Sequence, residues 1–297
     1  MTAPDVEATA DAFGLLADPS RVEILAALWE AEESEVGYAA LREATGLGDS
    51  GRFNYHLSKL TDHFVAKTGD GYRLRPAGLV VLNAIYAGSY VDAPTREGLD
   101  VEGECPTCGD DLVGLYDEGM FRVVCRECDR QLFVLSFPPR GVEQRSDDAL
   151  LHAVSVHARA HVRRSQSGLC PFCGGPMGSS LVLDAESALP AEILVATPCE
   201  NCGVANRASV GFAVLEHPAV AGFLEDCGVP RDAPPWRFDW CLRDDPVEVL
   251  DEDAPRVRVP VTAGNDGGDA VLYVTVGPDG DVVETERVDD GGTGTNA

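Results

Sequence analysis

Eight cysteines of the chain are arranged as four CxxC pairs, a spacing that is typical of metal-binding thiolates. The pairs fall into two groups of four: Cys105, Cys108, Cys125 and Cys128, and Cys170, Cys173, Cys199 and Cys202. Structural zinc sites are closed tetrahedra of four protein ligands, which two CxxC turns at the ends of facing hairpins can supply. The spacing therefore predicts two structural Zn²⁺ ions per chain, each held by a zinc ribbon.

The alternatives for these cysteines are a catalytic zinc site and a redox dithiol. A catalytic zinc keeps one coordination position open, whereas each group here fills four positions with thiolates. A redox CxxC pair normally stands alone after a strand and is not matched by a second pair. The two remaining cysteines, Cys227 and Cys241, lack such partners, and we expect them to be buried as small apolar residues.

Three histidines, His152, His157 and His161, lie in a segment that also carries several arginines. The glutamate of an HExxH zinc motif does not accompany them, so we do not expect these histidines to bind metal. The sequence shows no nucleophile beside a base, no phosphate-binding loop and no open metal site. We therefore predict that the protein is not an enzyme.

The elements that precede the cysteines are predicted to be helices closed by one β-hairpin. Asp18 and Pro19 suit an N-cap and an N1 proline, and Asp49 or Ser50 suits the cap of a later helix. The inward residues of that later helix are expected to be Phe53, Leu57, Leu60 and Phe64. The expected order is helices over 6–16, from 19, over 37–45 and from 50, strands at 65–68 and 72–75, and a helix from 76.

This order of elements is that of a winged helix-turn-helix, and the residues resemble those of ArsR-type transcriptional regulators, here of a haloarchaeal kind. The resemblance covers about the first third of the chain and is carried by three segments: ADPSRVEILAAL (17–28), YAALREATGLGDSGRFNYHLSKL (38–60) and VAKTGDGYRLRPAG (65–78). It implies a homodimer with the helix from residue 50 in the DNA major groove and the hairpin beside the backbone. No cysteine precedes Cys105, so the thiolate site of the metal-sensing members is missing from this domain.

The homodimer is expected to form through the first helix and the helix from Pro76 to Tyr90. The apolar stripe expected to make these contacts is Leu79, Leu82, Ile85 and Tyr86.

The charge of the chain indicates its environment more than its partner. Fifty acidic residues outnumber 23 basic ones, which gives a net charge of -27, and only Lys59 and Lys67 among the basic residues are lysine. Such a composition is typical of proteins from salt-loving organisms, in which molar salt screens the self-repulsion. Residues 51–75 differ from this pattern because five basic residues there face two acidic ones. A basic region within an acidic surface predicts DNA binding.

The residues of the helix from 50 that do not face inward are candidates for DNA contact. Arg52 is suited to guanine and Asn54 to adenine, while Ser58, Lys59 and Arg73 are suited to phosphates. The complete predicted DNA-binding surface is Ser50, Arg52, Asn54, Tyr55, Ser58, Lys59, Lys67 and Arg73.

We predict an α+β fold with a modular organisation. The expected parts are a winged helix-turn-helix domain (1–92), an acidic linker (93–104), a first zinc ribbon (105–145), a connecting helix (146–166), a second zinc ribbon (167–210), an α+β region (211–288) and a disordered tail (289–297). A helix is expected over 212–227, and the α+β region is expected to end in an antiparallel β meander. Trp236 and Trp240 are expected in the core, or as the floor of an effector pocket.

The predicted function is sequence-specific regulation of transcription in the cytoplasm of a halophile, with double-stranded DNA as partner. The zinc ribbons then serve structure, or contacts with an effector or with a protein of the transcription machinery. The alternative is a zinc-ribbon adaptor that binds protein or RNA and uses the winged domain for dimerisation. No signal peptide is recognisable, and the longest apolar stretch, residues 77–87, is shorter than the ~20 residues that span a bilayer, so no membrane partner is expected.

Overall fold

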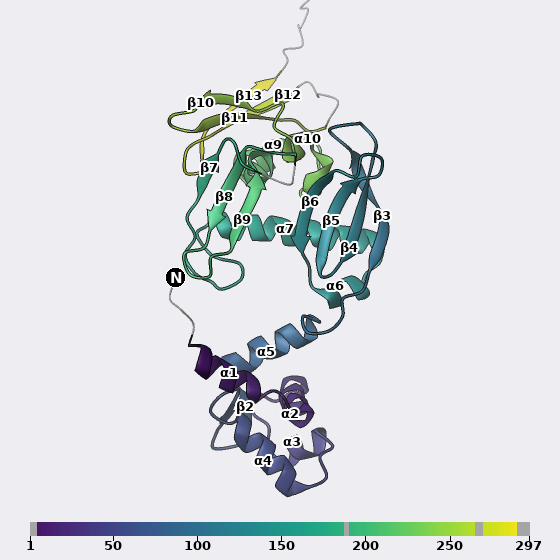
Figure 1. Ribbon diagram of the computed structural model, residues 1–297, viewed down its shortest axis with the longest axis vertical. Coiled ribbons are helices and arrows are strands. Elements are labelled where there is room, and N and C mark those ends of the chain that lie inside the picture. Colours follow the sequence, from purple (N-terminus) through teal and green to yellow (C-terminus); the bar gives the residue numbers. More distant parts are fainter. Residues whose placement is uncertain (1–4, 187–189, 265–269, 290–297) are drawn as a thin grey trace, which may run out of the picture. The chain divides into compact units, whose positions relative to one another are not determined.

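The computed structural model of the protein describes residues 5–186, 190–264 and 270–289, which combine helices with antiparallel sheets (Figure 1). The fold is therefore of the mixed α+β class, as predicted. The chain divides into two compact units, residues 2–92 and residues 93–297. None of the described helices has both the length and the apolar character that crossing a membrane requires.

The first unit consists of five helices and a two-stranded hairpin. They are α1 (Val6–Gly14), α2 (Pro19–Glu30), α3 (Tyr38–Ala44), α4 (Ser50–Leu60), β1 (Val65–Lys67), β2 (Tyr72–Leu74) and α5 (Pro76–Tyr86). Asp5, Asp18 and Asp49 cap the N-termini of α1, α2 and α4, because each carboxylate accepts a hydrogen bond from a backbone N–H of the first turn. The core is buried between α2, α3, α4 and α5 and includes Ile24, Leu25, Leu41, Phe53, Leu57, Leu60 and Leu82.

Helix α5 presents a different face from the one that its sequence predicted. Leu82 is only 1% exposed and belongs to the core of the first unit, and Ile85 packs against the same core. Of the predicted stripe, only Tyr86 is exposed, and the other exposed large apolar residue of this helix is Val80, which the stripe did not include. The predicted stripe is therefore wrong for Leu82 and Ile85, which the unit covers with its own hydrophobic residues, and Tyr86 is exposed as predicted.

The second unit begins with a four-stranded antiparallel sheet in the order β3-β4-β5-β6. Its strands are β3 (Arg96–Glu104), β4 (Asp111–Asp117), β5 (Met120–Cys125) and β6 (Gln131–Ser136). Strand β3 occupies the segment that was expected to be an acidic linker over 93–104. That prediction is wrong because Leu99 and Val101 alternate with the acidic residues and are buried in the core, as in a strand with one solvated face.

The next elements are two helices and a second sheet. Helix α6 (Pro139–Glu143) precedes the long helix α7 (Asp147–Gln166), which lies in the segment where a connecting helix was predicted. A three-stranded antiparallel sheet follows, in the order β7-β8-β9, with β7 (Ser180–Val182), β8 (Leu194–Pro198) and β9 (Ala205–Ser209).

The segment 212–227, predicted as one helix, forms two. Helix α8 (Val210–Val214) ends before His217, and α9 (Pro218–Asp226) begins after it. The break has a local cause: the His217 side chain caps α9, and Pro218 cannot donate the backbone hydrogen bond that a continuous helix needs. A 3-10 turn η1 (Pro235–Arg237) and the short helix α10 (Asp239–Leu242) complete the helical part.

The chain then forms the antiparallel meander that its alternating valines predicted. Its strands are β10 (Glu248–Asp251), β11 (Arg256–Val261), β12 (Ala270–Val276) and β13 (Val282–Asp289), paired in that order. Val257, Val259 and Val261 are completely buried, so one face of the sheet covers the core. Asp289 still belongs to β13, and the rest of the expected disordered tail, 290–297, lies outside the described residues.

One hydrophobic core joins parts of the second unit that were expected to be separate modules. Trp236 stands near its centre, with ring centroids 6.2 Å from Phe121 of the first sheet and 5.5 Å from Phe133. Residues of α7, the second sheet and the meander belong to the same core. Trp236, Trp240 and Cys241 are buried as predicted. The prediction for Cys227 is wrong, because this residue follows the last turn of α9 and is exposed.

We predict that Gly211→Ala destabilises the second unit by about 3 kcal/mol, because a Cβ atom at this position of α8 would overlap the backbone carbonyl oxygen of Trp240. The matched control is Gly222→Ala in α9, where a Cβ atom meets nothing within 4 Å and the glycine is exposed. That variant should gain roughly 0.5–1 kcal/mol, since alanine favours helix over the unfolded chain. Chemical unfolding followed by circular dichroism measures both values, and equal stability of the two variants would contradict the packing described.

Candidate metal centres and the surface of helix α4

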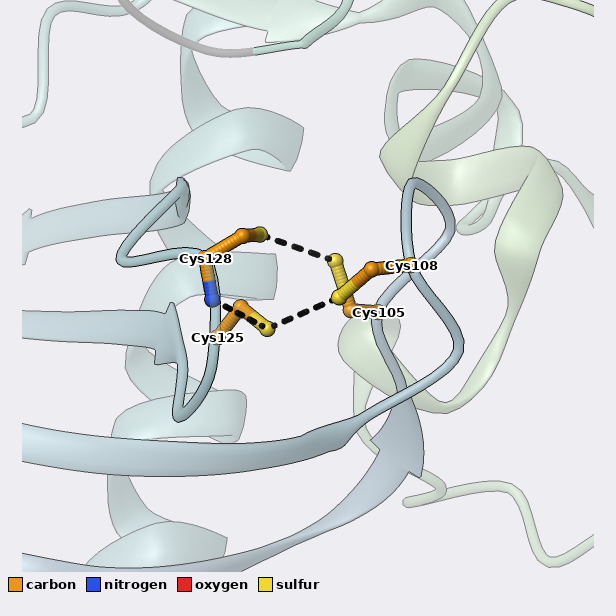
Figure 2. Close-up of side chains that lie close together, drawn as sticks. All are labelled: Cys105, Cys108, Cys125 and Cys128. Atoms are coloured by element: carbon orange, nitrogen blue, oxygen red, sulfur yellow. Dashed lines mark hydrogen bonds between the residues drawn. The ribbon is translucent and has the colours of Figure 1, made fainter.

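The first four paired cysteines converge on one point in space. Cys105 follows β3, Cys125 ends β5, and each is joined to its CxxC partner by a tight turn. Figure 2 shows the four side chains facing one another, with 3.8 Å between the Sγ atoms of Cys105 and Cys128 and 3.4 Å between those of Cys108 and Cys125. A tetrahedron with metal–sulfur bonds of about 2.3 Å has edges of about 3.8 Å. The cluster therefore has the dimensions of a four-thiolate metal site.

The second group of cysteines has the same geometry. The Sγ atoms of Cys170 and Cys202 lie 3.8 Å apart, and those of Cys173 and Cys199 lie 3.5 Å apart. In both clusters all four sulfur atoms lie within 4.8 Å of one another. The two clusters can thus bind two metal ions per chain, with every ligand supplied by the protein.

The turns that carry the sulfur atoms are shaped by residues with a left-handed backbone. Gly109, Gly174 and Gly203 follow three of the pairs with φ values between 70° and 77°, and Asp129 adopts φ 54° after the fourth. Aspartate tolerates this region better than most residues that carry a Cβ atom. Gly175 leaves space beside the second cluster. A Cβ atom at this position would lie 2.6 Å from Asn201 Cβ and 3.2 Å from the Sγ atoms of Cys173 and Cys199, so a larger residue would displace the cluster or Asn201.

Hydrogen bonds to sulfur favour the thiolate form that a metal requires. The Thr107 N–H donates to Cys105 Sγ at 3.4 Å. Burial opposes ionisation of Cys105, but backbone donors outweigh it and lower the pKa of this thiol to about 7. In the second cluster the side-chain amide of Asn201 donates to Cys173 Sγ at 3.5 Å and is the main cause that lowers the pKa of Cys173 to about 6. Each cluster thus holds a sulfur that is prepared to bind a cation.

The two clusters differ in what surrounds them. Cys105 and Cys125 belong to the large core of the second unit. Cys170 and Cys199 instead form a small separate core with Met177, against which Cys202 packs. The first cluster is therefore anchored in the main core, whereas the second depends on few apolar neighbours.

The residues predicted to contact DNA all lie on the surface of the first unit. Six of them are on α4 (Ser50, Arg52, Asn54, Tyr55, Ser58 and Lys59), Lys67 is on β1 and Arg73 is on β2, and all eight are exposed. Within the described part of the chain, Arg52, Lys59, Lys67 and Arg73 form no ion pair. Arg52 donates a hydrogen bond to Ser20 Oγ at 3.3 Å, and the Lys59 Nζ atom lies 5.8 Å from the centroid of the Tyr55 ring.

A polar network beneath α4 was not foreseen. His56 is 5% exposed, and its Nδ1 atom lies 3.4 Å from the donating Nε of Arg21 and 3.7 Å from Asp18 Oδ1. Arg21 also donates to the Leu15 carbonyl at 2.7 Å. These contacts hold α4 against the start of α2. The sequence did carry a signal, since His56 follows Phe53 by three positions and so lies on the buried face of the helix.

Two family profiles match the chain, and both describe domains of unknown function. DUF7347 matches residues 9–85, within the first unit, and DUF7351 matches residues 102–282, within the second. No curated protein matches the sequence.

We predict that the purified protein carries two metal ions per chain and that Cys105→Ser and Cys170→Ser each reduce the content to one. Because Cys105 belongs to the main core, Cys105→Ser should lower the melting temperature of the second unit more than Cys170→Ser does. The exposed Cys227 belongs to neither cluster, so Cys227→Ser should retain both ions. Elemental analysis and calorimetry measure these quantities. A metal content near zero in the wild type, or the same content in all three variants, would refute the assignment.

Proposed function

The chain belongs to the family of the domain of unknown function DUF7351, and from its own residues we propose that it is a sequence-specific DNA-binding regulator of transcription. In this proposal the first unit is a winged helix-turn-helix that resembles those of ArsR-type regulators. The second unit is a metal-stabilised domain whose ions are zinc, because four thiolates in a tetrahedron are the ligand set that structural zinc prefers.

The order and pairing of elements in the first unit support this proposal. Helices α3 and α4 are joined by the short segment 45–49, and α4 is followed directly by the β1–β2 hairpin. In a winged helix-turn-helix the second helix of such a pair enters the major groove, and the hairpin lies beside the DNA backbone. Helix α4 suits the role because its buried face holds it to the unit while its outer face is polar.

The observation that carries the proposal is the charge of that outer face. Arg52 and Lys59 project from α4, and Lys67 and Arg73 from the hairpin, without an ion pair to any described residue, in a chain of net charge -27. Unpaired cations on an otherwise acidic protein favour a polyanionic partner. Arg52 is suited to guanine and Asn54 to adenine, while Ser50, Tyr55, Ser58 and Lys59 suit contacts to the backbone.

The acidic composition further favours function at high salt. At molar salt the screening length falls to about 3 Å, so phosphate attraction contributes little and non-specific binding weakens steeply. Hydrogen bonds to base edges depend less on salt than phosphate contacts do. A protein that works under such conditions must therefore recognise DNA mainly through side chains such as Arg52 and Asn54.

A homodimer fits the apolar surface of the first unit. Helix α1 has no buried residue, and its Phe13 is 58% exposed. Val80 of α5 is 68% exposed, and Tyr90 beyond that helix is 66% exposed. These exposed apolar side chains are suited to a contact between two copies of the chain, because contiguous apolar surface marks contact sites in proteins.

The alternative function, an adaptor that binds protein or RNA through its metal-binding unit, is favoured by one observation. Three apolar residues near the cysteines of the second cluster are exposed: Leu169 and Phe172, which adjoin Cys170 and Cys173 in the sequence, and Val204, two positions after Cys202. Such residues suit contact with a partner protein, and in this case the first unit serves only dimerisation.

We predict that Arg52→Ala and Asn54→Ala each weaken specific DNA binding by about 1–3 kcal/mol and relax base preference at one position of each half-site. Lys59→Ala should weaken binding to all sequences alike, because a phosphate contact carries no base information. The control is Arg256→Ala, which removes an exposed arginine from β11 of the other unit. Genomic fragments enriched with the tagged protein in its host serve as ligands in a potassium chloride series up to molar concentrations. If the wild-type protein prefers no fragment at any salt concentration, the adaptor function becomes the better proposal.

We also predict that Phe13→Glu or Val80→Glu converts the homodimer to a monomer, because a buried carboxylate without a partner costs several kcal/mol at an apolar interface. Val283→Glu is the matched control, since Val283 is 56% exposed and lies in the second unit. Light scattering coupled to size-exclusion chromatography measures the mass. A wild-type monomer would refute the homodimer, and a dimer that persists in both variants would place the contact elsewhere.

A further inference from the structure

A surface groove of about 570 Å³ lies on the second unit, between helix α7 and the segment that follows α9. Its volume falls in the range of small-molecule sites, roughly 300–1,000 Å³. Val156, Ala160 and Arg163 line it and are spaced four and three residues apart along α7, so they lie on one face of that helix. All three are exposed, so the protein's own side chains do not fill this face.

The charge of the groove is opposite to that of the chain. Four arginines and two acidic residues line the groove, whereas the whole chain has 50 acidic residues and 23 basic ones. Three of the arginines, Arg163, Arg164 and Arg231, are exposed and form no ion pair with any residue that the structure describes. Uncompensated cations that line one concave surface raise the local concentration of anions. The groove therefore favours an anionic ligand.

The fourth arginine, Arg159, holds the two walls of the groove together. Its side chain is 14% exposed, forms an ion pair with Glu216 and donates a hydrogen bond to the Ala233 carbonyl at 2.9 Å. The charge of Glu216 is thus compensated by Arg159. The hydrogen bond to Ala233 fixes the segment that carries Arg231 beside α7, so arginines that are far apart in the sequence line one site.

The acidic residues of the groove limit the size of its positive region. Besides Glu216, the groove is lined by Asp232, whose Oδ2 atom lies 3.6 Å from His152 Nδ1 and whose side chain is 61% exposed. A nucleic-acid strand binds along a positively charged groove that follows its backbone, so these two carboxylates disfavour it. A small ligand can instead place its charge against the exposed arginines alone.

We propose that this groove binds a small phosphorylated molecule. A phosphate group carries about two negative charges at neutral pH and has three strong acceptor oxygens, which guanidinium groups bind in a bidentate geometry. A carboxylate carries one charge on two oxygens and is therefore a poorer match for three arginines. Arg163 and Arg231 bind the phosphate group from opposite walls, Arg164 adds a third positive charge, and the rest of the ligand covers Val156 and Ala160.

Titration calorimetry of the metal-loaded full-length protein with inorganic phosphate, in potassium chloride and without DNA, tests the proposal. Phosphate should bind with one site per chain, and acetate should bind at least about tenfold more weakly. Arg163→Gln and Arg231→Gln should each weaken phosphate binding about tenfold, as expected for the loss of a hydrogen bond to a charged group. Asp232→Asn should strengthen it about two- to fivefold, because a like charge is removed from an exposed position.

The matched control is Arg256→Gln, which removes an exposed arginine from β11 and should bind phosphate like the wild type. Absence of phosphate binding, equal binding of phosphate and acetate, or unchanged affinity in both Arg163→Gln and Arg231→Gln would overturn the proposal. Both variants should bind a DNA duplex of random sequence as the wild type does, and weaker binding in both would identify nucleic acid as the ligand and overturn it as well. Because the phosphate titration contains no DNA, its outcome is independent of whether the first unit recognises an operator.

Discussion

The second unit holds four cysteine sulfur atoms together at the ends of strands that also build its core. Cys105 and Cys125 are buried with the hydrophobic residues around Trp236, while their partners Cys108 and Cys128 are exposed. Negative sulfur atoms packed this closely repel one another unless a cation lies between them. Any metal ion bound there is therefore coupled to burial of the first sheet, and the register of β3 with β4 and β5 brings the four cysteines to one point.

The second cluster extends the same principle to a less buried setting. Its small core of Cys170, Cys199 and Met177 offers little hydrophobic stabilisation of its own. Phe172, between two of its ligands, makes an edge contact with His161 at a ring-centroid distance of 5.4 Å. His161 belongs to helix α7 and also lines a cavity between β6 and β9. The second cluster is thus linked to the main part of the unit through one aromatic contact.

In the first unit, the residues that hold helix α4 in position are different from the residues that give its outer face a positive charge. Phe53, Leu57 and the buried His56 fix helix α4 from the inside, and the Asp49 side chain caps its first turn. Its outer face is then free to carry arginine, asparagine and lysine without cost to packing. This separation explains how an acidic protein retains a basic surface on its first unit, since acidic residues need only be few in residues 51–75, where five basic residues face two acidic ones.

The sequence by itself determined the features that follow from local spacing. These are the two four-cysteine clusters, the helices of the first unit with Phe53, Leu57 and Leu60 inward, and the alternating valines of the meander. These features are local because ligand spacing and hydrophobic period act over a few residues. Only the tertiary structure decided that residues 96–104 form a strand and that α5 turns Leu82 inward. It also decided that Cys227 is exposed and that the segments after residue 92 share one core around Trp236. The His56 network and the cavity beside His161 likewise join residues far apart in the chain, and which side chains meet across such separations is set by packing.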